Sequence, residues 1–212
     1  MKQFMQMVCC AWALVGSGVV VAEEQIEPYQ QFQQRWAQAQ YQQQGDAKEA
    51  ALAKLAEEVR QASKQAPEDL KLKTWAGIII GSYAGAKGGL GALSLAKEAK
   101  VDYEAVIARD PGTLNGSALT SLGVLYYKVP GWPLGFGDEE KAAFLLKRGL
   151  NFNPDGIDSN YFYADSLAAT GKKQEALPYL EKALKAAPRP GRELADEGRR
   201  SEILALQKTL ME

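Results

Sequence analysis

The chain has 212 residues, of which 46% are hydrophobic and 24% are charged, and its formal net charge at pH 7 is −1. This balance offers no electrostatic basis for binding nucleic acid. The sequence contains no histidine and only two cysteines, so it lacks the commonest general base and most of the ligands of zinc sites. We therefore expect a protein that is not an enzyme and that uses no metal or cofactor.

The N-terminal segment, residues 1–22, has the pattern of a secretory signal peptide. Lys2 precedes an apolar stretch from Met5 to Val21, and the small residues at its end suit cleavage before Glu23. We expect a periplasmic mature chain with a single domain, residues 23–212. An uncleaved membrane anchor is the alternative, but a spanning helix needs a longer apolar run of about 20 residues.

Both cysteines, Cys9 and Cys10, lie inside this segment. The mature chain is therefore predicted to contain neither thiols nor disulfides. Lipid attachment at Cys10 is disfavoured, because Val8 and Cys9 precede it where a small residue is needed. Without residues 1–22 the chain has 24 Lys and Arg against 26 Asp and Glu, a net charge of −2.

Look-alike segments of the chain end at regularly placed prolines: Pro111, Pro154, Pro188 and, in a fainter copy, Pro67. Self-similarity at this spacing is typical of a helical repeat, because one helix pair cannot bury its apolar face alone and stacks on the next pair. The distance from Pro154 to Pro188 is 34 residues, which is the length of a tetratricopeptide repeat (TPR). The pattern resembles that repeat.

The last copy carries the repeat positions most clearly. Ala164, Ala176 and Ala183 occupy the small positions at which the two helices of a repeat touch, and Gly171 lies in the turn between them. We expect these alanines in the core. The predicted fold is all-α, a TPR-like helical-hairpin solenoid of about four helix pairs with a C-terminal capping helix. Its expected segments are 28–41 with 46–66, 72–111, 117–154, 157–188 and the closing helix 194–211.

Two turns within the repeats are predicted to be longer than usual. The first, Ala84–Gly91, is rich in glycine but lacks the context of a phosphate-binding loop, so we interpret its glycines as a tight turn or close helix packing. The second, residues 129–138, places Trp132 and Phe136 among prolines and glycines. This stiff loop either presents Trp132 to a partner or folds it over the stack as a lid.

Aromatic residues recur in the first helices of successive repeats, which line the concave face of such a solenoid. Neighbouring positions on a helix point to different faces, so we expect about half of these side chains in a groove suited to an apolar ligand or a peptide. Lys87 and Lys128 are candidates for holding a carboxylate. The candidate binding residues are Trp132, Phe136, Tyr126, Tyr127, Tyr83, Lys87, Lys128 and Tyr161.

Four segments, 83–91, 121–133, 136–138 and 153–158, together resemble the T component of TRAP transporters, and the resemblance covers roughly residues 72–205. It implies an α-helical periplasmic repeat protein that associates with the substrate-binding protein of an uptake system. It also implies homo-oligomers and a cleft suited to hydrophobic organic acids.

Two functional hypotheses follow. The first is a non-enzymatic periplasmic module for protein–protein interaction, accessory to a TRAP-type uptake system. The alternative is a carrier that holds a small apolar organic acid in the groove between repeats.

Overall fold

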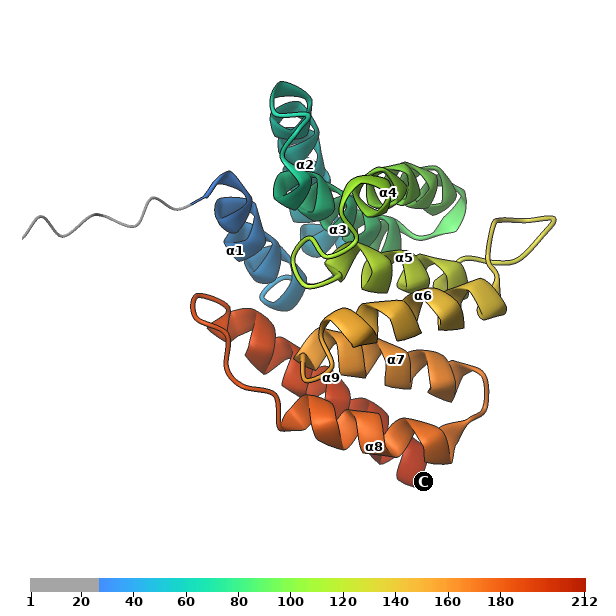
Figure 1. The fold of residues 1–212 in the computed structure, drawn as a ribbon. Helices are drawn as coiled ribbons and strands as arrows, with labels where there is room; N and C mark the ends of the chain where they lie inside the picture. The colour runs from blue at the N-terminus through green and yellow to red at the C-terminus, as the bar shows by residue number, and fades with distance from the viewer. Residues whose placement is uncertain (1–26) are drawn as a thin grey trace, which may run out of the picture.

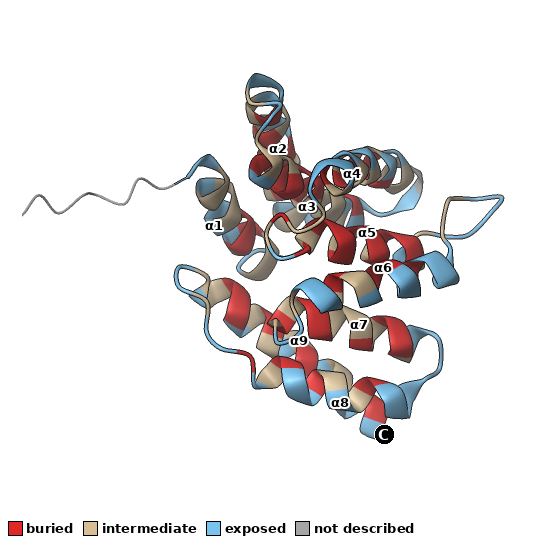
Figure 2. Cartoon of the chain, in the orientation of Figure 1, coloured by how far each residue is buried: buried red, intermediate tan, exposed pale blue. Residues whose placement is uncertain are grey.

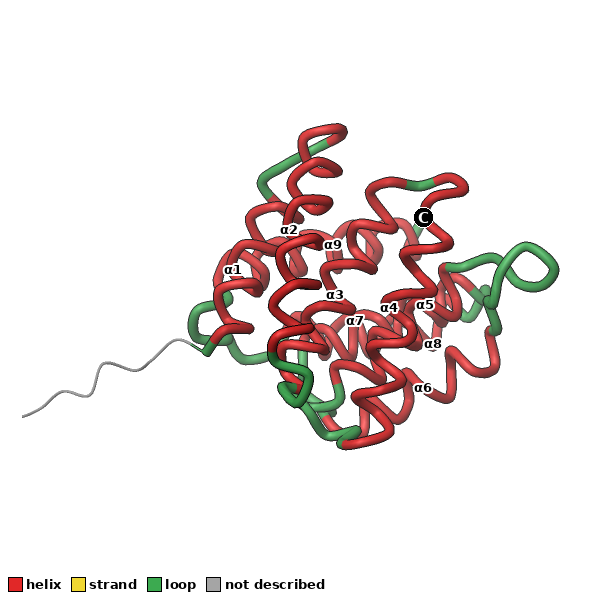
Figure 3. Tube along the Cα trace, turned by 90° about the horizontal axis from the view of Figure 1, so that it is seen from above, coloured by secondary structure: helices red, strands yellow, loops and turns green. Residues whose placement is uncertain are grey.

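The computed structural model describes residues 27–212 (Figure 1). The predicted signal peptide, both cysteines and the expected cleavage before Glu23 lie outside this range. The described chain consists of helices joined by turns and loops, and its only β-type pairing is an isolated bridge between Gly131 and Gly137 (Figure 3). None of the helices in residues 27–212 combines the length and the hydropathy that a membrane crossing requires.

Nine helices follow one another within the described range, and their ends have local causes. Pro28 occupies the first turn of the first helix, where its missing N–H is not needed. Asp69 and Asp138 cap two later helices by accepting backbone N–H groups at 2.9 Å. The helices are α1 (Pro28–Tyr41), α2 (Gly45–Gln65), α3 (Leu70–Lys87), α4 (Gly89–Arg109), α5 (Ser117–Lys128), α6 (Glu139–Phe152), α7 (Ile157–Ala169), α8 (Lys173–Leu184) and α9 (Glu193–Met211).

The helices pack as sequential hairpins. Helices α1 and α2, α3 and α4, α5 and α6, and α7 and α8 form the four pairs, and α1, α3, α5 and α7 also contact one another in succession. These first helices therefore form an inner layer, and the second helices form an outer one (Figure 1). The predicted four helix pairs with a closing helix are confirmed.

Small residues allow the paired helices to approach closely. Ala164, Ala176 and Ala183 are fully buried, which confirms their predicted place in the core. A Cβ atom on Gly123 of α5 would lie 2.7 Å from Leu146 Cγ of α6, too close for any larger residue. Buried residues concentrate on the facing sides of the helices, and the outward sides are exposed (Figure 2).

The turn predicted to be long at Ala84–Gly91 is short, so this prediction is wrong. Helix α3 continues to Lys87 and α4 begins at Gly89, leaving Gly88 between them. Gly88 and Gly89 have φ values of +61° and +59°, a region that glycine enters without steric cost. The tight-turn interpretation of these glycines is confirmed, and the additional residues of this repeat lengthen its two helices.

The loop between α5 and α6, residues 129–138, is the inserted segment expected from the sequence, and it projects from the edge of the stack (Figure 1). Trp132 is 89% exposed and Leu134 is 74% exposed, so Trp132 is not a lid on the core. Phe136 turns back instead, and its ring meets that of Tyr126 edge-on at 5.5 Å between centroids.

Helix α9 does more than cover the last repeat. It contacts α7 and α8, as expected for a closing helix, and it also contacts α1 at the other end of the chain. Gly198 makes this approach possible, since a Cβ atom there would lie 2.3 Å from Tyr41 Cδ1. The superhelix is thus closed by contact between its first and last helices.

Candidate functional site

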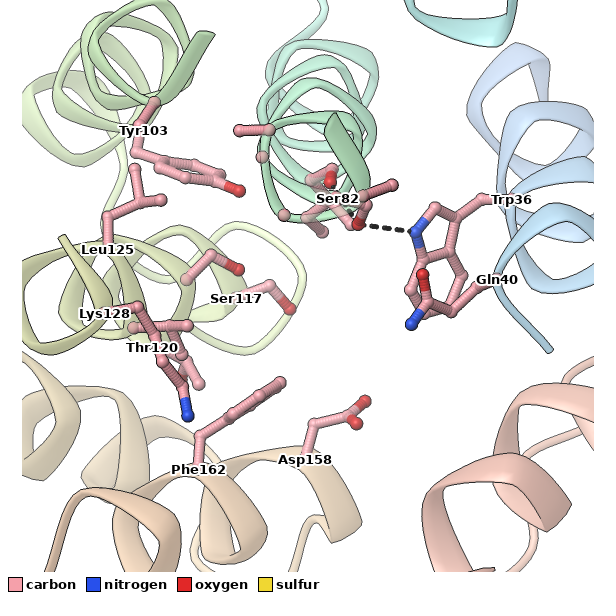
Figure 4. Close-up of a pocket in the computed structure, with 18 of the residues that line it drawn as sticks. Trp36, Gln40, Ser82, Tyr103, Ser117, Thr120, Leu125, Lys128, Asp158 and Phe162 are labelled. Atoms are coloured by element: carbon pink, nitrogen blue, oxygen red, sulfur yellow. Dashed lines mark hydrogen bonds between the residues drawn. The ribbon is translucent and has the colours of Figure 1, made fainter. Parts of the chain in front are cut away.

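A cleft of about 1130 Å³ lies on the concave side of the stack. Its walls come from the inner helices α1, α3, α5 and α7, with contributions from α2, α4 and the segment that leads into α9. Figure 4 shows Trp36 and Gln40 of α1 across the cleft from residues of α5, with Phe162 and Asp158 of α7 beside them. The exposed residues Gly45 and Asp46 line its rim, so the cleft opens to solvent.

The walls combine large apolar side chains with a few polar groups, the composition typical of a small-molecule site. Trp36 is fixed by its Nε1–H, which donates to Ser82 Oγ at 2.8 Å, and Ser82 in turn donates to Ile78 O at 2.7 Å. The apolar lining residues include Trp36, Trp75, Ile78, Leu93, Val124, Leu125, Leu134 and Phe162.

A row of stacked side chains joins the two ends of the chain at this cleft. The Trp36 ring meets Tyr41 and Trp75 edge-on at centroid distances of 5.8 and 5.6 Å. The Arg192 guanidinium, from the segment before α9, lies 5.2 Å from the Trp75 ring centroid. Aromatic pairs and cation–π contacts of this kind each contribute about 0.5–1.5 kcal/mol beyond area burial.

An ion-pair network fixes the segment that leads into α9. Asp158, at the start of α7, accepts from Arg189 Nη1 at 2.7 Å and from Arg199 Nε at 2.8 Å. Arg189 also donates from Nε to Asp196 Oδ1 at 2.7 Å, and Arg199 pairs with Glu202. The network holds α9 against α7.

The charges of this network shift the pKa values of its members. Burial alone would raise the pKa of Asp158, but the cations Arg199 and Arg189 outweigh it and hold that pKa well below its usual value. Burial likewise would lower the pKa of Arg199, and the attraction of Asp158 reverses the shift. Glu202 is different, because burial prevails over Arg199 and raises its pKa.

The predicted residues on α5 and its loop divide between core and cleft. Tyr126 is buried against Phe136. The Tyr127 hydroxyl donates to Asp165 Oδ2 at 2.6 Å, and Lys128 Nζ lies 2.8 Å from the same oxygen. Lys128 lines the cleft, whereas the other seven candidates, all within the described chain, do not.

The remaining predicted residues lie on other surfaces. Tyr83 packs partly against the core, with Lys87 Nζ 5.5 Å from its ring centroid. Lys87 is exposed and lies 3.5 Å from Glu49 Oε1. Tyr161 is half-buried beneath the Arg199 guanidinium at 4.6 Å from its ring centroid. These three residues thus contribute to helix contacts around the cleft.

Sequence reasoning missed several residues of the cleft. Trp36 lies in the first helix of the first pair, a position equivalent to that of the other aromatic candidates, and this spacing was a usable signal. Arg192 had none, because it reaches the cleft through the contact between α9 and the rest of the stack. Asp158 lines the cleft from the start of α7, but its partners Arg189 and Arg199 are distant in the chain, so no local pattern indicated these ion pairs. No group of three or more metal-ligating side chains occurs within residues 27–212.

Comparison with known proteins supports the fold and leaves the family open. No family model matches the chain. A solved structure, the thermophilic TPR protein TTC0263 of Thermus thermophilus, superposes with a TM-score of 0.54 at 21% identity, covering 86% of this chain and 90% of that one. The chain is therefore an all-α, TPR-like stack of hairpins. Stacked helical repeats of this kind present extended concave surfaces.

A second similarity covers less of the molecule. The Vi polysaccharide export protein VexE of Salmonella typhi is 36% identical over 95 residues, which are 43% of this chain and 13% of that protein. The match thus spans about an eighth of VexE. Neither of these two proteins is described as a T component of a TRAP transporter, so that resemblance stays a prediction.

Proposed function

We propose that the protein is an exported, non-enzymatic carrier whose concave cleft holds a small molecule with a largely apolar body and an acidic group. The observation that carries the proposal is the cleft itself, whose volume of about 1130 Å³ is of the size that small-molecule ligands occupy. The contact between α1 and α9 closes the superhelix beside it. An extended polypeptide therefore finds less room here than in an open solenoid groove.

The periplasm is the compartment we propose for this carrier, with a mature chain that begins at Glu23. The signal-peptide pattern of residues 1–22 supports this proposal. The intact mass of the chain recovered from the periplasm tests it, because retention of residues 1–22 would contradict cleavage.

Whether a ligand occupies the cleft can be tested with a substitution whose larger side chain fills the same space. Val124 of α5 lines the cleft and is half-buried, so Val124→Trp places an indole in the ligand's space. Val101 of α4 is 64% exposed and lies outside the cleft, which makes Val101→Trp a matched control. Native mass spectrometry of freshly purified protein should show a bound adduct in the wild type and in Val101→Trp, but not in Val124→Trp. An adduct that persists in Val124→Trp would contradict the proposal.

A second candidate function is a protein-interaction module that uses the loop 129–138. The favouring observation is the exposure of Trp132 and Leu134 at its tip, because large apolar side chains of this kind anchor many interfaces. If the TRAP resemblance holds, the partner is a periplasmic substrate-binding protein, and homo-oligomers are expected too. In-cell crosslinking should then capture one defined partner with the wild type and lose it in Trp132→Ala, since Trp132, unlike Leu134, does not line the cleft. Equal capture by both proteins would contradict this role.

A further inference from the structure

We propose that the cleft contains a subsite for the anionic group of its ligand, with the Arg192 guanidinium as the charged partner, held on the face of Trp75. This inference rests on the proposed carrier function, because it assigns the residue that recognises the acidic end of the ligand. The chemistry is that of a carboxylate or phosphate monoester bound by a guanidinium.

Most cations of the cleft already have carboxylate partners. Arg189 and Arg199 share Asp158, and Lys128 pairs with Asp165 at 2.8 Å. An anionic ligand at any of these would compete with a protein carboxylate for the same donors. The cations that line the cleft are Lys48, Lys128, Arg189, Arg192 and Arg199.

Arg192 is one of two cleft cations, with Lys48, that have no ion pair within residues 27–212. Its guanidinium makes no hydrogen bond or ion pair with any residue between 27 and 212, and its Nε is shielded from solvent without an acceptor. Burial lowers the pKa of Arg192 and the like charge of Arg189 lowers it further, while the carboxylates of Asp158 and Asp196 offset part of this shift. The guanidinium stays protonated at neutral pH, so it carries a charge that no carboxylate within residues 27–212 binds directly.

Trp75 supplies an independent observation at the same place. Its side chain is 3% exposed, and its Nε1–H is buried without an acceptor among the described residues. Buried donors without acceptors cost free energy in the empty protein. Both unpartnered donors belong to side chains that line the cleft and stack on each other, so this part of the wall is short of acceptors.

Lys48 is the other cleft cation without an ion pair in the described chain, but its surroundings disfavour an anion. The carboxylate of Glu202 stabilises its charge against the lowering of its pKa by burial. Asp46 and Glu49 add negative charge on the same turn of α2.

We expect the apolar body of the ligand to pack against the apolar part of the cleft walls, which includes Ile78 and Leu125.

Three probes with one alkyl chain separate the anionic contact from the apolar one: decanoate, decyl phosphate and decanol. Their dissociation constants are measured by calorimetry and by the fluorescence of the cleft tryptophans. Arg192→Met keeps an apolar stem on Trp75 without the charge, and Arg192→Lys keeps the charge without the planar fork. Arg148→Met is the matched control, since Arg148 also stacks on an aromatic ring, that of Phe144, but lies outside the cleft.

We expect the wild type to bind at least one anionic probe about 10-fold or more tightly than decanol, the contribution of a charge-assisted hydrogen-bonded contact. Arg192→Met should abolish that preference and leave decanol binding unchanged, Arg192→Lys should keep part of it, and Arg148→Met should keep it all. The stronger of the two anionic probes identifies the head group. Equal binding of decanol and both anions, unchanged in Arg192→Met, would overturn the subsite but leave the carrier function standing. If no probe binds the wild type, both proposals fail.

Discussion

The contact between α9 and α1 can be tested by adding a single methyl group. A Cβ atom at Gly198 would lie 2.3 Å from Tyr41 Cδ1, and the Tyr41 ring is held by its edge-on contact with Trp36. Alanine is favoured over glycine inside a helix by about 1 kcal/mol, whereas overpacking costs about 1–3 kcal/mol. Gly198→Ala should therefore lower the free energy of unfolding by about 1 kcal/mol.

A double-mutant cycle isolates this contact from the helix propensity. Once Tyr41→Ala has removed the ring, the three atoms nearest to the methyl group at position 198 are gone, and we expect the propensity gain to prevail. In that background Gly198→Ala should raise the free energy of unfolding by up to about 1 kcal/mol, so the effect of the substitution changes sign. Gly85→Ala is the control, because a Cβ atom at Gly85 of α3 meets nothing within 4 Å.

The free energy of unfolding is measured by urea denaturation, followed by circular dichroism and by tryptophan fluorescence. Stabilisation by Gly198→Ala in both backgrounds, as large as that from Gly85→Ala, would refute the reasoning. It would mean that α9 does not press on α1 in solution and that the cleft is open at this end.

Four further substitutions test other parts of the structure. Asp158→Asn removes the carboxylate shared by the buried Arg199 and the partly buried Arg189 and should destabilise the protein by about 3 kcal/mol at pH 7. Because the folded pKa of Asp158 is depressed, urea titrations should show this difference shrinking as the pH falls below about 4. Burial raises the pKa of Asp102 to about 6. Asp102→Asn should therefore stabilise the protein by about 1–3 kcal/mol at pH 7, and by nothing at pH 3, where Asp102 is protonated in the folded and the unfolded state. A gain in stability that persists at pH 3 would contradict this cause. In thermal denaturation, the stability of Trp132→Ala should lie within about 0.5 kcal/mol of that of the wild type. Phe136→Ala should lose about 1–2 kcal/mol of stability, because it removes the ring contact with Tyr126. The reverse order would mean that Trp132, not Phe136, packs on the stack.

The helix pairs could be predicted from the sequence because local signals define them. Helices α2, α4, α6 and α8 each end shortly before one of the four repeated prolines, whose missing N–H and fixed φ disfavour continuation of a helix. Pro178 lies inside α8 without ending it, so the regular spacing of the prolines was the signal. Small residues such as Ala164 and Ala176 mark close contacts between neighbouring helices, which are also close in the chain. The length of a turn was less certain, because Gly88 permits a one-residue connection where a glycine-rich stretch suggests a loop.

The cleft and its charged residues depend on tertiary structure alone. The small rotation between successive hairpins accumulates along the stack until α9 meets α1, and no local pattern around Tyr41 or Gly198 encodes that meeting. Arg192 contacts Trp75 because α9 packs against α1. The ion pairs around Asp158 in turn determine which cations of the cleft have a carboxylate partner. The sequence by itself determined the helices and their pairing through short-range sterics, whereas the binding surface arises from contacts between opposite ends of the chain.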